Sequence, residues 1–245
     1  MVEVPPLPAG LPDDGVPVAR ALLSRRSVRG FLPRPVPRAT IEGMLYLAAR
    51  APSGTNCQPW HVYACAGAVR DALVADLLAA HDAQAAGSRE HVQEYAYYPR
   101  QWREPFLGRR RKLGWDYYGL MGIERGDREA THAQHAKNFR FFGAPVGLFF
   151  TVDRDLEAGS WLDAGMFIQG VMTAARAYGL HTCPQAAFTP FHRIVRRHLA
   201  IPDGEVMLCG MAVGHIDDAA RENALAVGRE PVAAYARFAG FDATG

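Results

Sequence analysis

The chain has 245 residues, of which 49% are hydrophobic, and this is enough apolar material for the core of one domain. Its 27 basic and 25 acidic residues leave a formal net charge of +2, which is too balanced for a protein that binds nucleic acid through a strongly basic face. We therefore expect a single domain over residues 1–245 and no nucleic-acid partner.

The cysteines are scattered along the chain, with no close pair of the kind found in zinc sites and no dense disulfide framework. We expect reduced, mostly buried thiols and no metal. The first twelve residues lack the basic flank and apolar core of a signal peptide, and no apolar run approaches the roughly 20 residues of a membrane span. These features predict a cytoplasmic protein without a membrane partner.

The first predicted helix begins near Pro17, a residue typical of the first helical turn, and ends at the sequence Arg-Arg-Ser-Val-Arg-Gly-Phe of residues 25–31. Three guanidinium groups and a hydroxyl within five residues suit a phosphate, because the arginine fork makes bidentate hydrogen bonds and keeps its charge. A solvated basic turn, placed favourably at the C-terminal end of the helix dipole, is the alternative.

A second helix is predicted over residues 40–50, where apolar residues recur at helical spacing, and it stops at Pro52. The loop of residues 51–60 reads Ala-Pro-Ser-Gly-Thr-Asn-Cys-Gln-Pro-Trp. Its short hydrogen-bonding side chains suit recognition of the edge of a polar heterocycle, although a surface turn with Asx and Ser capping has the same composition. A short strand is predicted over residues 61–65.

An Ala/Leu-rich helix over residues 68–83 is followed by an excursion at about 87–128, in which tyrosines and tryptophans alternate with basic residues. Aromatic faces with nearby cations can cap a planar aromatic ligand by stacking and cation–π attraction. Long excursions in compact domains are often functional lids. An irregular packing subdomain with a solvated basic face is the alternative interpretation.

The nearly continuous apolar run of residues 146–152 predicts a central strand. The helix predicted over residues 161–178 is apolar on nearly every side, which indicates a subunit interface and hence a homodimer. Small residues in the extended stretch 181–188 would let backbone amides approach a ligand. The remaining predicted elements are helices at 132–142 and 191–199, a strand at 205–213, and a loop and tail after residue 221.

Several enzyme classes lack their motifs in this chain. No Gly-x-Gly-x-x-Gly follows a strand, no Gly-x-x-x-x-Gly-Lys-Ser/Thr is present, and no Gly-x-Ser-x-Gly elbow occurs. A Rossmann nicotinamide site, a P-loop and a serine-hydrolase elbow are therefore unsupported. His132 and His135 have a spacing that could hold a metal, but no carboxylate follows in a recognised pattern.

The order Arg-Arg-Ser-Val-Arg-x-Phe, then Ala-Pro-Ser-Gly-Thr-Asn-x-Gln-Pro-Trp, resembles the opening of the FMN-dependent nitroreductase family. The resemblance continues through residues 138–145, 161–188 and 229–231. It implies an α+β fold with a mixed β-sheet flanked by helices, in a homodimer whose C-terminal tail is exchanged onto the partner's sheet. One bound FMN would explain the arginine cluster, the polar loop and the aromatic excursion together, and it would carry the redox chemistry itself.

The resemblance also implies roles for individual residues. The positions that match those holding the ribityl phosphate are Arg25, Arg26, Ser27 and Arg229, whereas Arg29 matches the position beside flavin N1 and O2, where a cation would stabilise the reduced flavin. The positions that match the loop reaching the flavin across the dimer interface are Pro52, Ser53, Asn56 and Gln58. The backbone of Ala186 and Ala187 would face flavin N5, with further contacts from Asn138, Pro184 and Gln185. Trp115, Tyr117 and Tyr118 are the expected substrate lid.

By this resemblance the protein transfers hydride from NADH or NADPH through FMN to a nitroaromatic or quinone in a ping-pong cycle. A reductive dehalogenase of the iodotyrosine deiodinase type is one alternative, for which Glu94, Tyr95 and Lys112 have the residue types of the required lid. A flavin-binding or sequestering protein without turnover is another. The physiological substrate and the preferred nicotinamide stay open at this point.

Overall fold

The computed structural model describes residues 2–8, 10 and 12–241. Its centre is a four-stranded sheet in the order β1-β2-β4-β3, and every neighbouring pair of strands is antiparallel. The strands are β1 (Trp60–Ala66), β2 (Val146–Asp153), β3 (His181–Gln185) and β4 (Glu205–Gly214). The resemblance implies a mixed sheet, which contains both parallel and antiparallel pairs of strands. Within one chain, the only parallel pairing among the described residues is an isolated bridge between Ser27 and Thr182.

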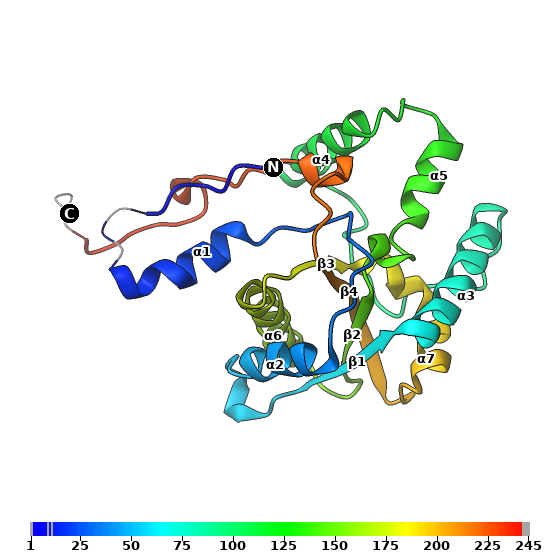
Figure 1. The fold of residues 1–245 in the computed structure, drawn as a ribbon, viewed down its shortest axis with the longest axis horizontal. Coiled ribbons are helices and arrows are strands. Elements are labelled where there is room, and N and C mark those ends of the chain that lie inside the picture. The colour runs from blue at the N-terminus through cyan, green and yellow to red at the C-terminus, as the bar shows by residue number, and fades with distance from the viewer. Residues whose placement is uncertain (1, 9, 11, 242–245) are drawn as a thin grey trace.

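The seven α-helices of the described residues form two layers on the sheet and a periphery. They are α1 (Val16–Ser24), α2 (Arg38–Ala48), α3 (Gly67–Ala85), α4 (Phe106–Leu120), α5 (Arg128–Ala136), α6 (Ala158–Ala177) and α7 (His192–Leu199). Helices α2 and α6 lie on one side of the sheet, and α3 and α7 lie on the other (Figure 1). Most predicted helices and strands are present, with bounds that differ by a few residues. The helix predicted over residues 132–142 ends at Ala136, and residues 186–188, which were expected to be extended, lie in a 3-10 helix. Helix α4 was not among the predicted elements.

Strand β2 is central because its side chains are buried on both faces. Leu148 and Phe150 join the core cluster of α2 and α6, whereas Phe149, which points the other way, joins the cluster of α3 and α7. Seven of its eight residues are buried, which confirms the central strand predicted from the continuous apolar run.

The periphery includes α4, α1 and both ends of the chain. The N-terminal arm and the C-terminal tail extend away from the sheet on the side of α1 (Figure 1). Tyr235, Phe238 and Phe241 of the tail are exposed. No described helix is long and apolar enough to cross a lipid bilayer.

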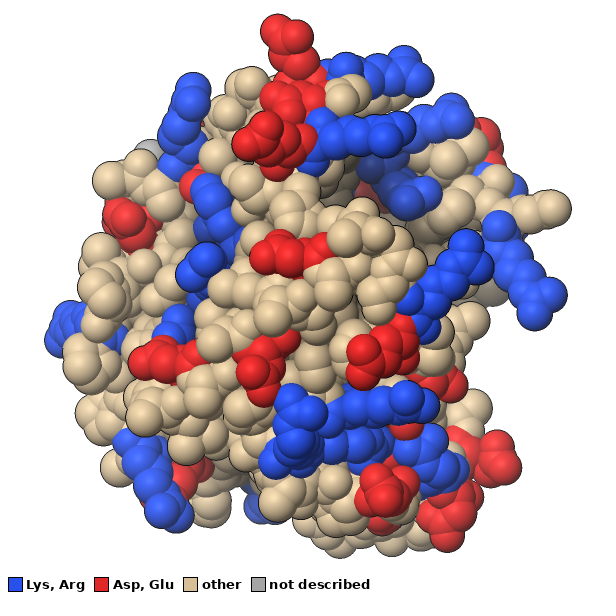
Figure 2. Space-filling model, turned by 90° about the vertical axis from the view of Figure 1, so that its right-hand side faces the viewer, with Lys and Arg blue, Asp and Glu red and all other residues tan. Residues whose placement is uncertain are grey.

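The surface on the side of α3 and α7 carries both signs of charge. Figure 2 shows Lys and Arg interspersed with Asp and Glu over this face. Asp76, for example, lies 2.8 Å from both Arg197 and His198. Such a mixed face differs from the extended basic surface that a non-specific nucleic-acid binder presents.

Candidate active site

The arginine segment follows directly from the end of α1. Arg25 is extended at the helix C-terminus, and the next residues run beside β3, where the Val28 N–H donates to the Thr182 carbonyl at 3.1 Å. Val28 is fully buried, so its side chain anchors the segment in the core. The local sequence therefore positions the arginine cluster, because α1 ends just before it and the following extended segment pairs with the edge strand β3.

Asn223, which no pattern in the sequence marks, holds this segment from the opposite end of the chain. Its Oδ1 accepts from the Arg29 N–H and its Nδ2 donates to the Gly30 carbonyl, each at 2.8 Å. Its own carbonyl accepts from Arg26 Nη1 at 2.8 Å. A side chain at Gly30 would place Cβ only 2.2 Å from the Ala220 Cβ, so glycine is required for this close approach.

Positive charge accumulates around the segment. Burial lowers the pKa of Arg25, and the neighbouring Arg229 guanidinium lowers it further. Burial also lowers the pKa of His181, to about 4, with further contributions from Arg176 and Arg26. None of these four arginines has a carboxylate partner among residues 2–8, 10 and 12–241. Arg25, Arg26 and Arg176 are partly buried, whereas Arg229 is exposed. Partly buried cations that lack a counter-charge form a strong site for an anion.

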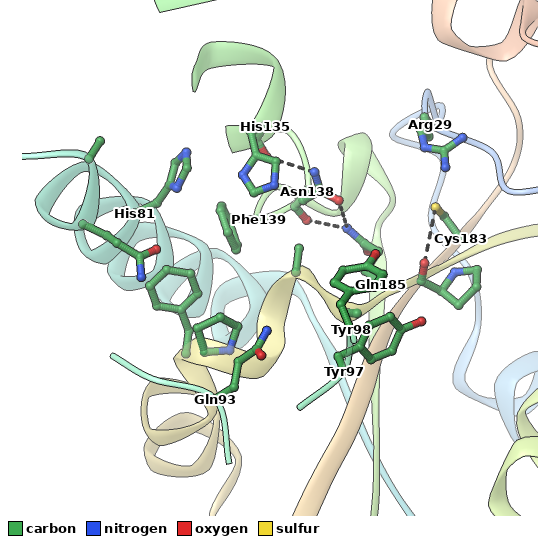
Figure 3. Close-up of a pocket in the computed structure, with 17 residues that line it drawn as sticks. Arg29, His81, Gln93, Tyr97, Tyr98, His135, Asn138, Phe139, Cys183 and Gln185 are labelled. Atoms are coloured by element: carbon green, nitrogen blue, oxygen red, sulfur yellow. Dashed lines mark hydrogen bonds between the residues drawn. The ribbon is translucent and has the colours of Figure 1, made fainter. Parts of the chain in front are cut away.

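Arg29 opens onto a cavity of about 560 Å³. Figure 3 shows that Arg29 and Cys183 lie at one end of this cavity and His81 and Gln93 at the other. The predicted residues that line it are Arg29, Asn138, Pro184, Gln185, Ala186 and Ala187. The structure therefore brings together three segments that are more than 40 residues apart along the chain.

Gln185 has an unsatisfied atom in this cavity. The side chain is only 3% exposed, and its Nε2 donates to the Asn138 carbonyl at 2.8 Å. Its Oε1 is buried without a hydrogen-bond partner in the described part of the chain. A buried amide oxygen of this kind needs a donor, so the cavity suits a ligand with an N–H or O–H on its edge.

Cys183 is not suited to act as a nucleophile. Burial raises the pKa of its thiol to about 11, although the nearby Arg29 acts in the opposite direction. The thiol is therefore neutral at physiological pH. The arrangement has the features of a binding site for a cofactor rather than those of a covalent catalyst.

Tyr97, Tyr98, His81 and His135 also line the cavity, and they were not among the predicted site residues. The rings of Tyr97 and Tyr98 meet edge to face at 4.7 Å. Burial lowers the pKa of His81 and of His135, so both are neutral near pH 7. The aromatic content of residues 87–128 was a signal for the tyrosines, but no local pattern marks the histidines, which come from α3 and α5.

The predicted lid residues Trp115, Tyr117 and Tyr118 line a second cavity, of about 610 Å³, which also includes Arg29. The Arg29 guanidinium carbon lies 5.3 Å from the centre of the Tyr117 ring, in a cation–π contact. The Tyr117 hydroxyl accepts from Gln134 Nε2 at 2.7 Å, which ties α4 to α5. Part of the excursion therefore lies beside Arg29, and its role as a substrate lid stays a prediction.

The first half of the excursion is fixed to the body of the protein. Glu94 is only 12% exposed on its side chain and accepts from Arg154 at 2.6 Å, with Arg196 at 3.3 Å. The Tyr95 hydroxyl donates to the Leu208 carbonyl in β4. Lys112 is exposed on α4 and pairs with Asp116 at 2.7 Å. Glu94 and Tyr95 thus act in packing, which argues against the zwitterion clamp of a deiodinase.

The loop with Pro52, Ser53, Asn56 and Gln58 lies elsewhere in the chain. Its Gly54 N–H donates to Asp163 Oδ2 of α6 at 3.1 Å, while Asn56 and Gln58 are exposed. These four residues do not line the Arg29 cavity of their own chain. The resemblance expects them to serve the partner's site, so a single chain does not test that role.

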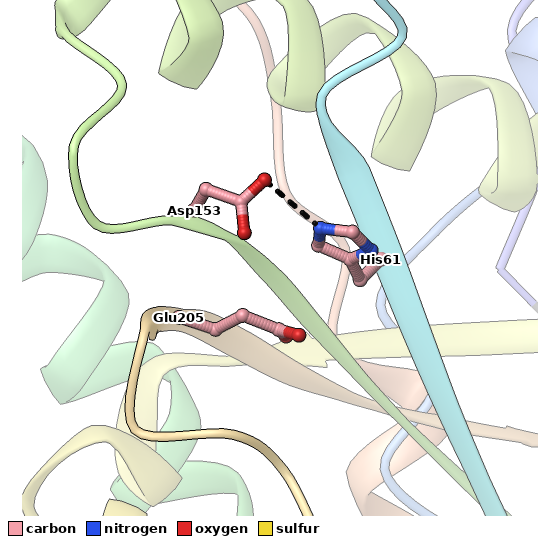
Figure 4. Close-up of side chains that lie close together, drawn as sticks. All are labelled: His61, Asp153 and Glu205. Atoms are coloured by element: carbon pink, nitrogen blue, oxygen red, sulfur yellow. Dashed lines mark hydrogen bonds and ion pairs between the residues drawn. The ribbon is translucent and has the colours of Figure 1, made fainter.

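A further cluster of ligand-type atoms joins three strands at the other end of the sheet. His61, Asp153 and Glu205 lie together in Figure 4, with their ligand atoms within 4.8 Å of one another. The Glu205 carboxylate accepts from the Tyr63 hydroxyl at 2.8 Å and from the Thr151 hydroxyl. Glu205 and Ala212, which pairs with Cys183, are separated by about 23 Å of strand. The cluster is thus separate from the Arg29 cavity.

Comparison with known proteins agrees with this geometry. The model of the nitroreductase family matches residues 22–215. The 4-nitrobenzoate reductase of Pseudomonas putida is 40% identical over 219 residues, which is 89% of this chain and 94% of that protein.

Two solved structures are also similar. The FMN and NADPH-dependent nitroreductase NfnB from sphigopyxis sp. strain HMH is 37% identical with a TM-score of 0.86, and the match covers 91% of this chain and 99% of that one. The FMN-dependent nitroreductase NfnB from Mycobacterium smegmatis, in complex with NADPH, is 30% identical with a TM-score of 0.87, over 93% of this chain and 100% of that one. By sequence and by fold, the chain belongs to the nitroreductase family.

Proposed function

We propose that the protein is an FMN-dependent oxidoreductase that takes electrons from NADPH or NADH and reduces nitroaromatic compounds or quinones. The observation that carries the proposal is the uncompensated charge of Arg25 and Arg26, which lie on the same short segment as Arg29. Arg29 lines the cavity, whereas the predicted phosphate ligands Arg25, Arg26, Ser27 and Arg229 do not line it themselves. A phosphate on a ligand that enters the cavity would supply the missing negative charge. The named activities and cofactors of the similar nitroreductases support the same proposal.

The residues of the site fit FMN. Arg25, Arg26, Ser27 and Arg229 would hold the phosphate. Arg29 would lie at the edge of the ring system, and the buried Gln185 Oε1 offers an acceptor in the same cavity. Asn138, Pro184, Ala186 and Ala187 would complete the wall.

When bound, FMN supplies the ability to accept two electrons from a nicotinamide and to pass them to an acceptor. The chain supplies binding, orientation and electrostatics. In the first two-electron step on a nitro group, one NADPH and one proton are consumed, NADP⁺ and water are released, and the nitro group becomes a nitroso group. The positive charge of Arg29 would favour the electron-rich state at the ring edge, and no nucleophile from the protein is needed.

We further propose that the active form is a homodimer. The outer face of α6 carries Leu162, which is 68% exposed, and it adjoins an apolar cavity of about 590 Å³ lined also by Leu47, Ala51 and Pro52. The exposed aromatic residues of the tail need cover as well. A partner that packs on α6 and receives the tail would bury both surfaces and would bring the residue 52–58 loop to the neighbouring flavin.

Sizing chromatography with light scattering tests the dimer. We expect twice the chain mass at micromolar concentration and a monomer for Leu162→Glu. The control Leu113→Glu, a change of an exposed leucine on α4, should remain dimeric. A wild-type protein that elutes as a monomer would refute this proposal.

The activity is tested with purified holoprotein in a matrix of NADH and NADPH against 4-nitrobenzoate, menadione and iodotyrosine. We expect turnover with the nitroarene or the quinone and little release of iodide. Iodide release as the main reaction would favour the deiodinase alternative. Flavin that neither nicotinamide reduces would favour a sequestering protein. We place the protein in the cytoplasm, where NADPH is supplied and where its buried thiols Cys65 and Cys183 stay reduced.

A further inference from the structure

One face of α4 carries cations and aromatic rings that the flavin contacts do not use. Arg111, Trp115 and Tyr118 are spaced i, i+4 and i+7, so they lie on the same side of the helix. They line the cavity of about 610 Å³ that Arg110 also lines and that reaches Arg29. Nothing lies within 4 Å of a Cβ placed at Gly114, so this face is open between its cations and its aromatic rings.

The charges on this helix are paired unevenly. Arg109 pairs with Glu230 at 3.0 Å, and Lys112 pairs with Asp116 at 2.7 Å. Arg110 and Arg111, which lie between them, have no carboxylate partner in the part of the chain that the structure describes. Two guanidinium groups that line one cavity without a counter-charge are suited to an oxyanion.

Arg110 is held in place by aromatic contacts. Its guanidinium carbon lies 4.9 Å from the centre of the Trp102 ring and 5.9 Å from that of Tyr98. Trp115, in contrast, is 70% exposed. An exposed tryptophan beside an open cavity offers a flat apolar face on which a heteroaromatic ring can stack.

We propose that this face binds the adenosine end of NADPH, with Arg110 and Arg111 on the 2′-phosphate and Trp115 against the adenine. The inference rests on the proposed function, because it assumes that a nicotinamide reaches the cavity beside Arg29. Six residues of helix, about 9 Å, separate Arg111 from Tyr117, which contacts Arg29. Arg111 and Arg29 line the same cavity, and this shared lining is the reason for placing both ends of one dinucleotide along this helix. The 2′-phosphate is the group that distinguishes NADPH from NADH, so this site makes the protein prefer NADPH.

Direct binding gives the first test. Calorimetry on wild-type holoprotein should show binding of 2′,5′-ADP at least about tenfold tighter than that of 5′-AMP, as expected for one charge-assisted contact. Arg111→Gln should reduce this difference by about tenfold. Trp115→Ala should weaken both nucleotides. Equal affinities of the wild type for the two nucleotides would overturn the proposal, and this measurement does not depend on turnover.

Kinetics gives the second test, with menadione as an uncharged acceptor. Arg110→Gln and Arg111→Gln should each lower kcat/KM for NADPH by about tenfold and change kcat/KM for NADH less than about twofold. The matched control is Lys112→Gln, which removes a cation of the same helix that already has a partner, and it should leave the NADPH preference unchanged. Flavin absorbance checks that each variant is loaded. Because Arg110 also packs on Trp102, Arg111→Gln is the decisive variant.

The failures of the two proposals are distinguishable. Wild-type flavin that neither nucleotide reduces would refute the proposed function, whereas efficient reduction with equal effects of Arg111→Gln on NADPH and NADH would refute only this site. A loss of activity toward 4-nitrobenzoate with an unchanged NADPH preference would instead assign the arginines to the carboxylate of the substrate.

Discussion

Replacement of Arg25 by alanine should weaken FMN binding and leave riboflavin binding unchanged. Arg25 is half-buried beside Arg229 and has no carboxylate partner in the described residues, so a bound phosphate would be its main counter-charge. A hydrogen bond to a charged group contributes about 1.5 to 3 kcal/mol. At 1.4 kcal/mol for each factor of ten, the dissociation constant for FMN should rise about ten- to a hundredfold.

Riboflavin lacks the phosphate, so it serves as the internal control for the ring contacts. Titration of flavin-free protein, followed by quenching of flavin fluorescence, gives both dissociation constants. The matched control is Arg38→Ala, which removes an exposed arginine of α2 that pairs with Glu42. The thermal stability of flavin-free Arg25→Ala should be no lower than that of the wild type, because the change relieves the repulsion with Arg229. An unchanged affinity for FMN would refute the phosphate clamp.

Four further results are expected. Initial rates with varied NADPH and acceptor should give parallel double-reciprocal lines, because the described residues form no separate dinucleotide-binding fold. Intersecting lines would indicate two distinct sites. Tyr118→Ala should weaken the binding of an aromatic substrate by about 0.5 to 1.5 kcal/mol beyond the effect of lost burial, and it should change the order of activity among nitroarenes and quinones. If the variant loses flavin instead, α4 serves only to pack the protein. The free energy of unfolding of the flavin-free protein should fall as the pH is lowered from about 6.5 to about 4, because His181 binds a proton in the unfolded chain but not in the folded protein. Urea titrations of His181→Asn should show a smaller fall over the same pH range. Glu94→Ala should lower the free energy of unfolding by about 3 kcal/mol, because it leaves Arg154 and Arg196 without their carboxylate partner. An unchanged urea midpoint would show that these ion pairs do not stabilise the protein.

The local patterns of the sequence predict much of this fold. Pro17 marks the start of α1, and the apolar run after Pro145 marks β2, since both signals depend on neighbouring residues alone. The arginine cluster was found for the same reason. The resemblance to a family then connected residues such as Ala186 with Arg29, which share the cavity but lie far apart in the sequence.

Contacts between distant segments were the main omissions. Asn223 binds Arg29 across 194 positions, and no local pattern marks it. Tyr97 was noticed as an aromatic residue, but its place in the Arg29 cavity depends on how the segment around Glu94 is fixed to Arg154 and Arg196. These ion pairs of Glu94 are tertiary contacts. They fix the first half of the excursion to the body of the protein, whereas the second half contains α4.

Anaerobic stopped-flow absorbance of the FMN holoprotein tests the central claim most directly. We expect NADPH to bleach the absorbance of the oxidised flavin, and we expect subsequent addition of 4-nitrobenzoate or menadione to restore it in the absence of oxygen. A flavin band that persists under excess NADPH and excess NADH, or a reduced flavin that neither acceptor reoxidises, would contradict the account.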